Sequence, residues 1–468
     1  MTKSGIDWLT HPTGDPFADI GGFVIETLRE VKPGSSTMDL IRFATQIYVN
    51  QWDNNLHSFF LNSTITHNSS KGQKGYVKTI AYFEKLLSDQ EGEYGHCRIT
   101  GKNGIVYNGA RDNHIMSGSA TLINFHHGFE TGIKVSKEVL IRIFFVPLGV
   151  ELVGDKIAVI TSNYTELTRF IVRRNVKNNL SALGSNMSRS VLRSPFKSPV
   201  NALFRHAQSC IDDSEAVTSA ITPDGNAAHD ISLNLYHFTN FGASPYIELY
   251  TLPAVVFFFY AYCLQTYRRD WQRFVNAHYW SSQVKGATFD EDSDTWSTPK
   301  EIFTEETYKT WRNPVLESLL SGKPLTPLLV TYMKAHHLPF EIIEVYLTNL
   351  REMEKRTIQK IKQLADFIVD NRSDDEIKKF LTRLNGARNT TELRSFIVNL
   401  STQNYLERKR DPLCSVDEFT SYLFPDGSNW RETRDVLLIA IYEKLHLADI
   451  RVETELKETE NTSENLNP

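Results

Sequence analysis

From Thr326 onward the sequence repeats apolar residues at the spacing of α-helices, and this pattern limits the possible folds more than any other feature of the chain. Ile361, Leu364 and Ile368, for example, follow one another along a single helical stripe. Helix-start signals of the form Ser-x-x-Glu precede further apolar runs. Because helices with one apolar face each pack together as a bundle, we predict a helical bundle over residues 326–451.

Residues 1–325 mix the signals of helices and strands. Asp15 followed by Pro16 is typical of a helix start, and Gly21 and Gly22 within that helix indicate that another element of the core approaches closely. A chain of 468 residues is also too long for one small core. The predicted fold is therefore α+β, with a mixed N-terminal body and a C-terminal helical bundle. Short segments rich in β-branched and aromatic residues are read as strands, at 138–148, 156–163 and 244–253.

The composition is that of a globular protein with a formal net charge of -5. Its four cysteines lie far apart and form no CxxC pair, which favours a reducing compartment and a cytoplasmic location. The apolar run Leu252–Leu264 is shorter than the roughly 20 residues that span a bilayer, so we expect it to be buried and expect no membrane partner. The polar, acidic tail over 452–468 is expected to be disordered.

A block of positive charge stands out in this acidic chain, because residues 169–210 contain no Asp or Glu. Cations that no neighbouring acid neutralises, interspersed with Asn and Ser, are what a phosphate backbone selects. We read the block as a strand that leads into a mobile basic loop, which orders on nucleic acid. The alternative is a solvated loop whose basicity is incidental. The predicted DNA-binding residues are Arg169, Arg173, Arg174, Lys177, Arg189, Arg193, Lys197 and Arg205.

Motifs for catalysis are missing from the sequence. There is no Walker A, GxSxG or HExxH motif, and adjacent histidines are poorly placed to bind one metal ion. The acidic run Asp290–Asp294 is more typical of a hydrated loop than of a nuclease site. We therefore predict that the protein is not an enzyme and uses no cofactor.

Three segments together resemble the large subunit of type I-B CRISPR Cascade complexes. They are TGDPFADIGGFVIE (13–26), SGSATLINFHHGFETGIKVSKEVL (117–140) and YHFTNFGASPYIELYTLP (236–253). The resemblance is closest to the branch named for paired CxxC motifs, and it extends in the same order over roughly the first 260 residues. The helical C-terminal part resembles the family in its layout and not in any motif.

The sequence departs from that family where the paired CxxC motifs stand. The first position reads CRIT, with Cys97 followed by Thr100, and the second reads SKEV, with Ser136 and Val139 in place of cysteines. A structural zinc ion needs four ligands, and one cysteine cannot hold it. We therefore predict a degenerate zinc-finger-like region over 95–140 that binds no metal.

The resemblance implies a function in RNA-guided DNA recognition. The large subunit of such complexes recognises the protospacer-adjacent motif in duplex DNA, promotes unwinding and R-loop formation, and holds the displaced strand on its helical C-terminal part. Flexible, polar segments near the degenerate region suit the reading of base pairs. The candidates for reading the motif are Lys102, Asn103, Asn108, Arg111, Ser117, Ser119 and Asn124. The candidates for binding the displaced strand are Lys355, Lys362, Lys378, Lys379 and Arg383.

The partners implied by the resemblance are those of an antiviral ribonucleoprotein. They are a guide CRISPR RNA, target double-stranded DNA, the backbone and guide-capping subunits of Cascade, and a downstream helicase-nuclease or transposition machinery. Helical small subunits made from an internal start, at Met333 or Met353, are a further expectation. The alternative is a non-catalytic scaffold that binds RNA or protein, with the basic block in contact with guide RNA.

Overall fold

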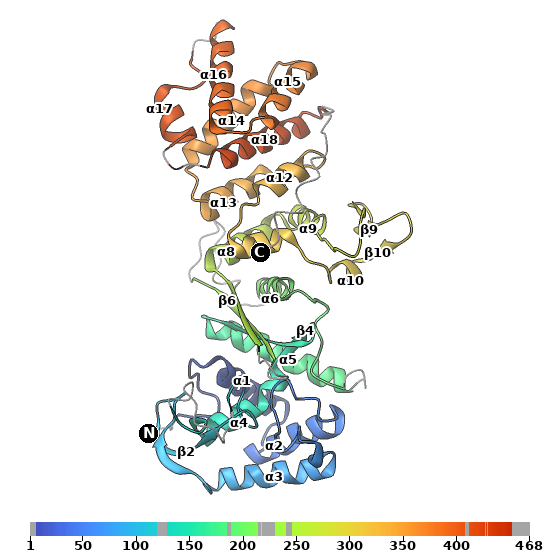
Figure 1. Cartoon of the computed structure of the whole chain (residues 1–468), viewed down its shortest axis with the longest axis vertical. Coiled ribbons are helices and arrows are strands. Elements are labelled where there is room, and N and C mark those ends of the chain that lie inside the picture. Colours follow the sequence, from blue (N-terminus) through green and yellow to red (C-terminus); the bar gives the residue numbers. More distant parts are fainter. Residues whose placement is uncertain are drawn as a thin grey trace. The chain divides into compact units, whose positions relative to one another are not determined.

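The computed structural model describes residues 6–118, 129–184, 189–213, 217, 230–239, 246–407, 411–425, 427 and 429–451. It has mixed helices and antiparallel sheets followed by a helical C-terminal region, so the predicted α+β class is confirmed (Figure 1). The chain divides into two compact units, Met1–Ala261 with Tyr279–Leu316, and Tyr262–His278 with Glu317–Pro468. Their division after Leu316 precedes the predicted boundary at 325, and the second unit also includes an earlier segment.

The first unit combines helices with three antiparallel sheets, of orders β4-β5-β6-β7, β1-β2-β3 and β10-β9-β8. Its strands are β1 (Glu93–His96), β2 (Asn103–Gly109), β3 (Ile133–Ser136), β4 (Glu151–Val153), β5 (Lys156–Ser162), β6 (Leu233–Thr239), β7 (Tyr246–Leu252), β8 (Thr288–Asp290), β9 (Thr295–Ser297) and β10 (Ile302–Phe303). Its helices are α1 (Pro16–Val31), α2 (Thr37–Gln46), α3 (Gln73–Leu87), α4 (Lys137–Phe145), α5 (Thr165–Gly184), α6 (Pro199–Asp213) and α10 (Glu305–Tyr308), while α8 (Ala254–Thr266) and α11 (Pro314–Ser321) cross the division between the units. Shorter 3-10 and π segments are η1 (Ile47–Gln51), η2 (Asn68–Ser70), η4 (Val146–Gly149) and η5 (Phe419–Leu423), the last in the second unit.

Helix α1 packs against α4 and α5, and this contact depends on glycine. A Cβ atom placed on Gly21 would lie 1.9 Å from the backbone oxygen of Arg142, and one on Gly22 would lie 3.3 Å from the oxygen of Leu9. The close approach that the sequence predicted at these two glycines is therefore confirmed. Asp15 caps the helix through the N–H of Ala18, as predicted.

The prediction of a strand at 138–148 is wrong, because these residues form α4 and η4. Helix α4 is buried on every side, with residues 139–145 all inaccessible to solvent. A helix that is buried all round has no polar face, so its sequence lacks the helical period and resembles a buried strand. The other two predicted strands are confirmed as β5 and β7.

The predicted strand at the start of the 169–210 block is wrong, because this part lies in α5, and α6 covers the end of the block. The described residues 189–198 between the two helices are not helical, and the mobility of a loop there stays a prediction. The buried face of α5 includes Asn175 and Asn179 beside apolar residues. Asn175 Nδ2 donates to the carbonyl oxygen of Gly149 at 3.0 Å, and Asn179 Nδ2 donates to the carbonyl oxygens of Leu148 and Val150, each at 3.1 Å. Because polar residues occupy core positions of α5, its apolar stripe could not be recognised from the sequence. Their buried amides form hydrogen bonds that join α5 to the segment before β4.

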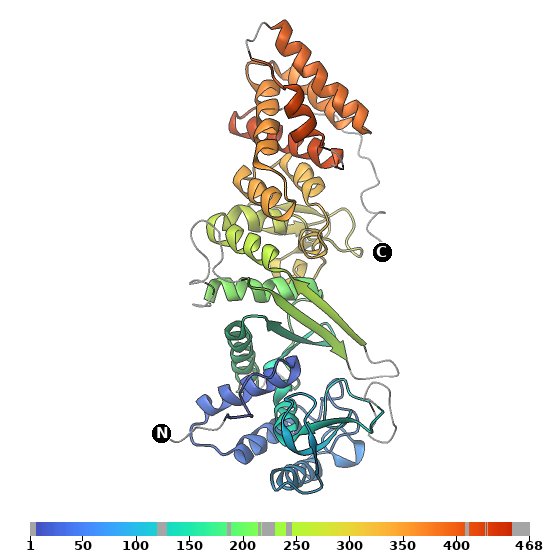
Figure 2. The ribbon, with the colours of Figure 1, turned by 90° about the vertical axis from the view of Figure 1, so that its left-hand side faces the viewer.

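The second unit is helical. Helices α14 and α18 pack side by side, and α12 packs on α18 (Figures 1 and 2). From the earlier segment, Phe274 contacts Tyr332 with ring centroids 5.2 Å apart. The predicted capping boxes at Ser373 and Ser415 are both formed. The helices are α9 (Arg268–Asn276), α12 (Thr326–Met333), α13 (Phe340–Leu350), α14 (Lys355–Val369), α15 (Asp374–Asn385), α16 (Thr390–Leu406), α17 (Val416–Glu418) and α18 (Trp430–Leu447).

Candidate nucleic-acid interface

Half of the predicted DNA-binding cations are engaged with groups from other parts of the first unit. Arg169 pairs with Glu166 and, at 2.9 Å, with Glu26, while Arg173 pairs with Glu30. Both glutamates of α1 lie far from the basic block in sequence. Folding therefore neutralises charges that the sequence alone shows as unbalanced.

Arg174 and Arg193 are held as well. Arg174 Nη2 lies 3.2 Å from His206 Nδ1, and His206 Nε2 lies 2.9 Å from a carboxylate oxygen of Glu151. Burial would raise the pKa of Glu151, but the charges and hydrogen bonds of His206 and Arg174 lower it below its ordinary value. Arg193 forms an exposed ion pair with Asp155 at 3.1 Å. The contacts of Arg174, His206 and Glu151 form a buried network that joins α5, α6 and β4.

The remaining four predicted cations are exposed, and none forms an ion pair with a residue that the structure describes. Lys177 lies on α5 and Arg205 on α6, two helices in contact with each other. Burial lowers the pKa of Arg174, and the nearby charge of Arg205 lowers it further, while the charges of Glu151 and Asp213 act in the opposite direction. Exposed cations that form no ion pair suit contact with phosphates. The four are Lys177, Arg189, Lys197 and Arg205.

The candidates for motif reading are distributed along β2 and the loop after it. Lys102 and Asn103 are exposed at one end of β2. At the other end, Asn108 accepts a hydrogen bond from Lys134 Nζ at 2.6 Å, and the side chain of Arg111 is exposed. Ser117 is buried, and its hydroxyl lies 2.8 Å from His114 Nδ1, so it faces away from solvent. The structure thus leaves Lys102, Asn103, Asn108 and Arg111 exposed, with the Asn108 side chain already bonded to Lys134. Ser119 and Asn124 lie outside the described residues.

In the region 95–140, where a degenerate zinc finger was predicted, a tight turn follows Cys97. The N–H of Thr100 donates to the Cys97 sulfur at 3.4 Å, and Gly101 turns the chain with φ +68°. Burial alone would raise the pKa of the Cys97 thiol, but hydrogen bonds from Thr100 and from the N–H groups of Ser136 and Ile99 lower it. The two degenerate motifs therefore meet at this sulfur.

The residues at that sulfur do not fit zinc. Thr100 and Ser136 offer neutral hydroxyls, and Val139 is a fully buried hydrocarbon at the start of α4. One thiol with these neighbours lacks the four thiolate or imidazole ligands of a structural zinc site. Hydrogen bonds to sulfur hold the two strands and the helix together here. Among the described residues there is no cluster of three or more His, Cys, Asp and Glu side chains that could hold a metal ion.

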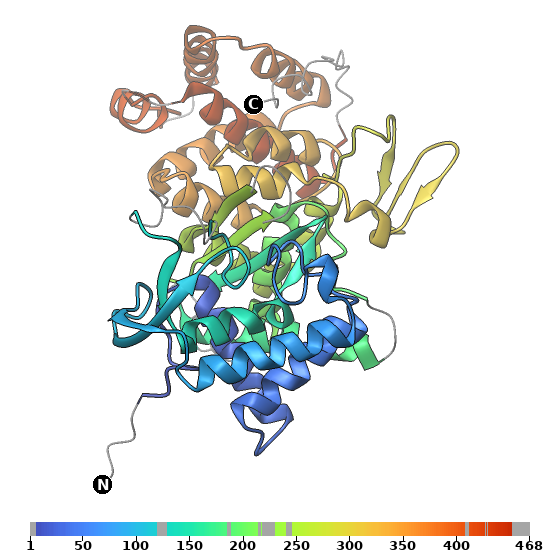
Figure 3. The ribbon, with the colours of Figure 1, turned by 60° about the horizontal axis from the view of Figure 1, so that its bottom comes forward.

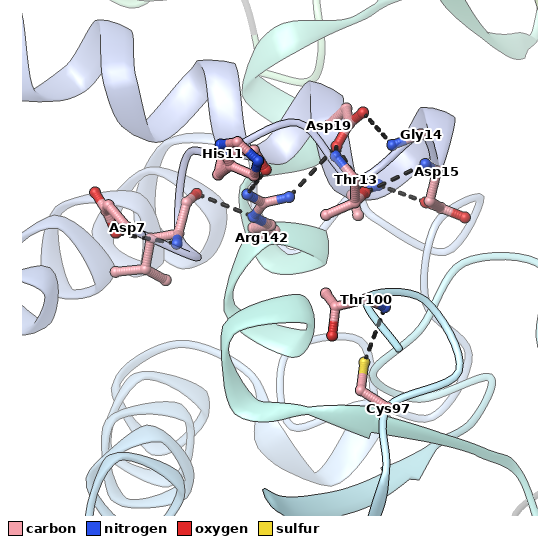
Figure 4. A network of polar contacts seen from close by, with 11 residues as sticks. Asp7, His11, Thr13, Gly14, Asp15, Asp19, Cys97, Thr100 and Arg142 are labelled. Atoms are coloured by element: carbon pink, nitrogen blue, oxygen red, sulfur yellow. Dashed lines mark hydrogen bonds and ion pairs between the residues drawn. The ribbon is translucent and has the colours of Figure 1, made fainter. Parts of the chain in front are cut away.

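The N-terminal motif that carries part of the family resemblance builds the core (Figure 4). Arg142 is completely buried, and its guanidinium donates to the carbonyl oxygens of Leu9, at 3.0 Å, and His11. Asp19 lies 3.4 Å from the same guanidinium and accepts hydrogen bonds from the N–H groups of Thr13 and Gly14. This network ties the segment before α1 to α4 and makes no surface for a ligand.

The acidic run at Asp290–Asp294 forms the turn between β8 and β9, in the yellow arm of Figure 3. The carboxylate of Asp290 accepts hydrogen bonds from the N–H groups of Asp292 and Ser293, at 2.9 and 3.3 Å. The Asp290 carboxylate thus provides the acceptor for two backbone N–H groups of its own turn, as is common for Asp in hydrated turns.

A groove in the second unit brings together three of the candidates for displaced-strand binding. Lys378, Lys379 and Arg383 are exposed on α15, and none forms an ion pair with any residue described in the structure. Lys379 and Arg383 lie one helical turn apart, where like charges cost about 0.2–0.5 kcal/mol. The groove has a volume of about 590 Å³ and is lined by Arg372, Asp375, Glu376, Lys378, Lys379, Phe380, Thr382, Arg383 and Gln403.

The other two candidates lie outside the groove lining. Lys355 is exposed at the start of α14. Lys362 pairs with Glu344 at 3.3 Å, and its ammonium lies 4.1 Å from the centre of the Phe340 ring. Lys362 thus already contacts α13. The three cations of α15 are better placed to bind the phosphates of a strand.

The sequence did not predict the contribution of α16 to this groove. Gln403 follows Phe396 and Leu400 at helical spacing, where an apolar residue is expected. Its Oε1 atom is buried and has no hydrogen-bond partner among the residues that the structure describes. A polar residue at an apolar position of the stripe is the signal that could have identified it.

The comparison with protein families matches residues 334–467 to the DevT C-terminal domain. DevT is a CRISPR-associated, Cascade-like protein, so this similarity fits a CRISPR-associated role for the chain. Comparisons with curated proteins and with solved structures find no match. Of the helices that the structure describes, none is both long and apolar enough to cross a membrane.

Proposed function

We propose that this chain is the large subunit of a type I-B CRISPR Cascade complex. In this role it recognises the protospacer-adjacent motif in duplex DNA, promotes R-loop formation and holds the displaced strand, while guide-RNA pairing reads the target sequence. The protein acts in the cytoplasm, binds without catalysing a reaction and needs no cofactor. Its partners are the guide RNA, the backbone and guide-capping subunits, small subunits, and a downstream helicase-nuclease or transposition machinery.

The observation that carries this proposal is where the basic groove lies. Lys378, Lys379 and Arg383 fall inside the segment 334–467 that matches the DevT C-terminal domain. Grooves that bind single strands without sequence preference line the path of the backbone with cations. Three exposed cations with no ion pair to a described residue supply that property in a chain whose net charge is -5.

The first unit supports a duplex contact of a different kind from the predicted mobile loop. Helices α5 and α6 present Lys177 and Arg205 from fixed positions, so the duplex would meet a preformed surface. Contacts from these cations to phosphates would position the DNA without reading it. Lys102, Asn103 and Arg111 would then be the exposed side chains available to read base pairs.

The test of the single-strand assignment measures binding of a single-stranded DNA to the purified chain as a function of salt. In the variant Lys378→Gln, Lys379→Gln, Arg383→Gln we expect at least about a tenfold loss of affinity and a salt slope smaller by about 2, because each phosphate contact contributes about 0.7. The control Lys71→Gln, Lys74→Gln, Lys285→Gln removes the same charge from exposed positions of the first unit. Equal binding by the two variants would contradict the assignment.

Duplex specificity separates the proposal from its main alternative. If the chain recognises the adjacent motif, a duplex that contains the motif binds more tightly than a scrambled duplex of the same length. Equal binding of the two duplexes would favour a scaffold whose basic residues contact guide RNA.

A further inference from the structure

The hairpin of β1 and β2 presents an aromatic ring to solvent. Tyr94 of β1 lies directly opposite Ile105 of β2, and His96 lies opposite Asn103 in the same register. Because the side chains of paired residues point to the same side of a sheet, these four side chains share one side of the hairpin. The Tyr94 residue is 79% exposed and Ile105 is 38% exposed. His96 and Asn103 are exposed as well.

The turn that joins the two strands fixes the position of a cation beside this side. The N–H of Cys97 donates to the carbonyl oxygen of Lys102, and the N–H of Gly101 donates to the carbonyl oxygen of Cys97, both at 2.9 Å. Lys102 is exposed, and its ammonium group lies 5.6 Å from the centre of the Trp8 ring. An aromatic ring and a cation are therefore held on the same hairpin.

The groups on this side suit a nucleobase. They are a phenol ring, an imidazole, an amide and an aliphatic side chain, with no carboxylate among them. Glu93, the acid of β1, alternates to the other side of the strand, where it pairs with Lys134. Every base has a π face that stacks on an exposed aromatic ring, and the imidazole and the amide can bond to its polar edge.

We propose that Tyr94 stacks on an unpaired base of a DNA strand, while Lys102 binds a phosphate of the same strand. Stacking adds affinity without reading sequence, because it tolerates any base. The inference rests on the proposed function in DNA binding and adds to it a site for an unpaired base in the first unit. This site is separate from the groove on α15, which belongs to the second unit.

The test compares the binding of a single-stranded DNA with that of an abasic strand of the same length. The parent for this test is the variant Lys378→Gln, Lys379→Gln, Arg383→Gln, so that the groove on α15 contributes little. In that parent, Tyr94→Ala should bind the normal strand at least about fivefold more weakly, and Tyr94→Trp should bind it as tightly as the parent. The salt slope should not change with either substitution, because the ring carries no charge. Binding of the abasic strand should be the same for all three proteins.

Two further variants serve as controls. Tyr405→Ala removes a tyrosine that is equally exposed, at 79%, from α16 in the second unit, and it should alter the binding of neither strand. Lys102→Gln should weaken the binding of both strands and lower the salt slope by about 0.7. Since the Tyr94 side chain lies mostly in solvent, Tyr94→Ala should keep the melting temperature of its parent.

The outcomes separate this inference from the function on which it rests. Unchanged binding of the normal strand by Tyr94→Ala would overturn the proposed stacking. An equal loss on the normal and abasic strands would also overturn it, because the ring would then not contact a base. Neither result bears on motif recognition, which is tested by motif-containing and scrambled duplexes. If those duplexes bind equally while Tyr94→Ala loses affinity for the normal strand alone, the base contact stands and motif recognition is wrong.

Discussion

Arg142 shows how a single buried side chain can account for a sequence motif. Its guanidinium holds the segment before α1 through Leu9, His11 and Asp19, and its backbone oxygen lies where a Cβ atom on Gly21 would have to be. The backbone at position 142 thus requires glycine at position 21, and the Arg142 side chain lies 3.4 Å from a Cβ atom placed on Gly22. The motif around Gly21 specifies the contact between α1 and α4, and a ligand is not needed to explain it.

Gly21→Ala should therefore be strongly destabilising. The added methyl group would lie 1.9 Å from the Arg142 oxygen, and a backbone atom cannot move away without shifting a helix. We expect a loss of at least about 3 kcal/mol in the free energy of unfolding, measured by chemical denaturation. Gly184→Ala is the control, because its Cβ would meet nothing within 4 Å, and little change is expected there. Similar stability of the two variants would show that α1 can move aside.

Asp15 provides a test of electrostatics at the same helix. Burial raises the pKa of Asp15 above its ordinary value of 3.8, so the folded state binds the proton more tightly than the unfolded chain does. The resulting stability is present at low pH and is lost as the pH rises through the folded-state pKa. Asp15→Asn keeps the acceptor for Ala18 and carries no charge.

We therefore expect Asp15→Asn to melt above the wild-type chain at about pH 7, with the difference shrinking toward about pH 4. Asp15→Ala removes the cap as well and should be about 1 kcal/mol less stable than Asp15→Asn at both pH values. Thermal unfolding at the two pH values checks both expectations. A constant difference between the Asn variant and the wild type would mean that the Asp15 carboxyl is not penalised by burial.

At the scale of elements, the turn after β1 is closed by hydrogen bonds to one sulfur. Cys97 accepts hydrogen bonds from Thr100 and Ser136, which occupy two of the positions where the resemblance places cysteines. These hydrogen bonds link the turn to the start of α4, where Val139 is buried.

This geometry predicts that a zinc site can be rebuilt. The variant Thr100→Cys, Ser136→Cys, Val139→Cys, together with Cys97, should bind about one zinc ion per chain and melt at a higher temperature than its metal-free form. Elemental analysis of protein purified under reducing conditions gives the metal content. Replacing Cys97 by Ser in this variant should abolish the binding. A folded triple variant without zinc would show that the four positions do not converge as the structure indicates.

How far the sequence predicts these elements depends on how regular their surroundings are. Helices α14 and α15 have one apolar and one polar face, so their spacing and the capping box of α15 were sufficient to predict them. Helix α4, buried all round, and helix α5, with Asn175 and Asn179 in its core, break that rule and were misread. Their environment is set by residues far away in the sequence.

The candidate site was predictable to a similar extent. Lys378, Lys379 and Arg383 can be found from charge on one helix face. Two other facts depend on tertiary contacts: that Arg169 and Arg173 meet glutamates of α1, and that a second helix contributes to the groove. Charge patterns along a chain therefore identify cations, and the fold decides which of them stay unpaired.

At the scale of the whole molecule, an acidic chain keeps a few exposed cations that form no ion pair within the described ranges. Neutralising Lys177 and Arg205 by glutamine should weaken binding of the assembled complex to motif-containing duplex and lower the salt slope by about 0.9 for each lost contact. Arg169→Gln and Arg173→Gln, at ion-paired positions, should change the slope less. Salt titrations of duplex binding compare the two pairs. A larger effect from the ion-paired arginines would indicate that those ion pairs open on DNA.

The second unit is assembled from two stretches of chain, and this limits how the protein can be dissected. Trp271 and Phe274, both fully buried, come from the earlier stretch, and Phe274 packs on Tyr332. A product translated from Met333 would lack that stretch and α12, which covers part of α18. Any freestanding small subunit made this way would have to hide the uncovered surface of α18 by some other means, such as association with a neighbouring subunit.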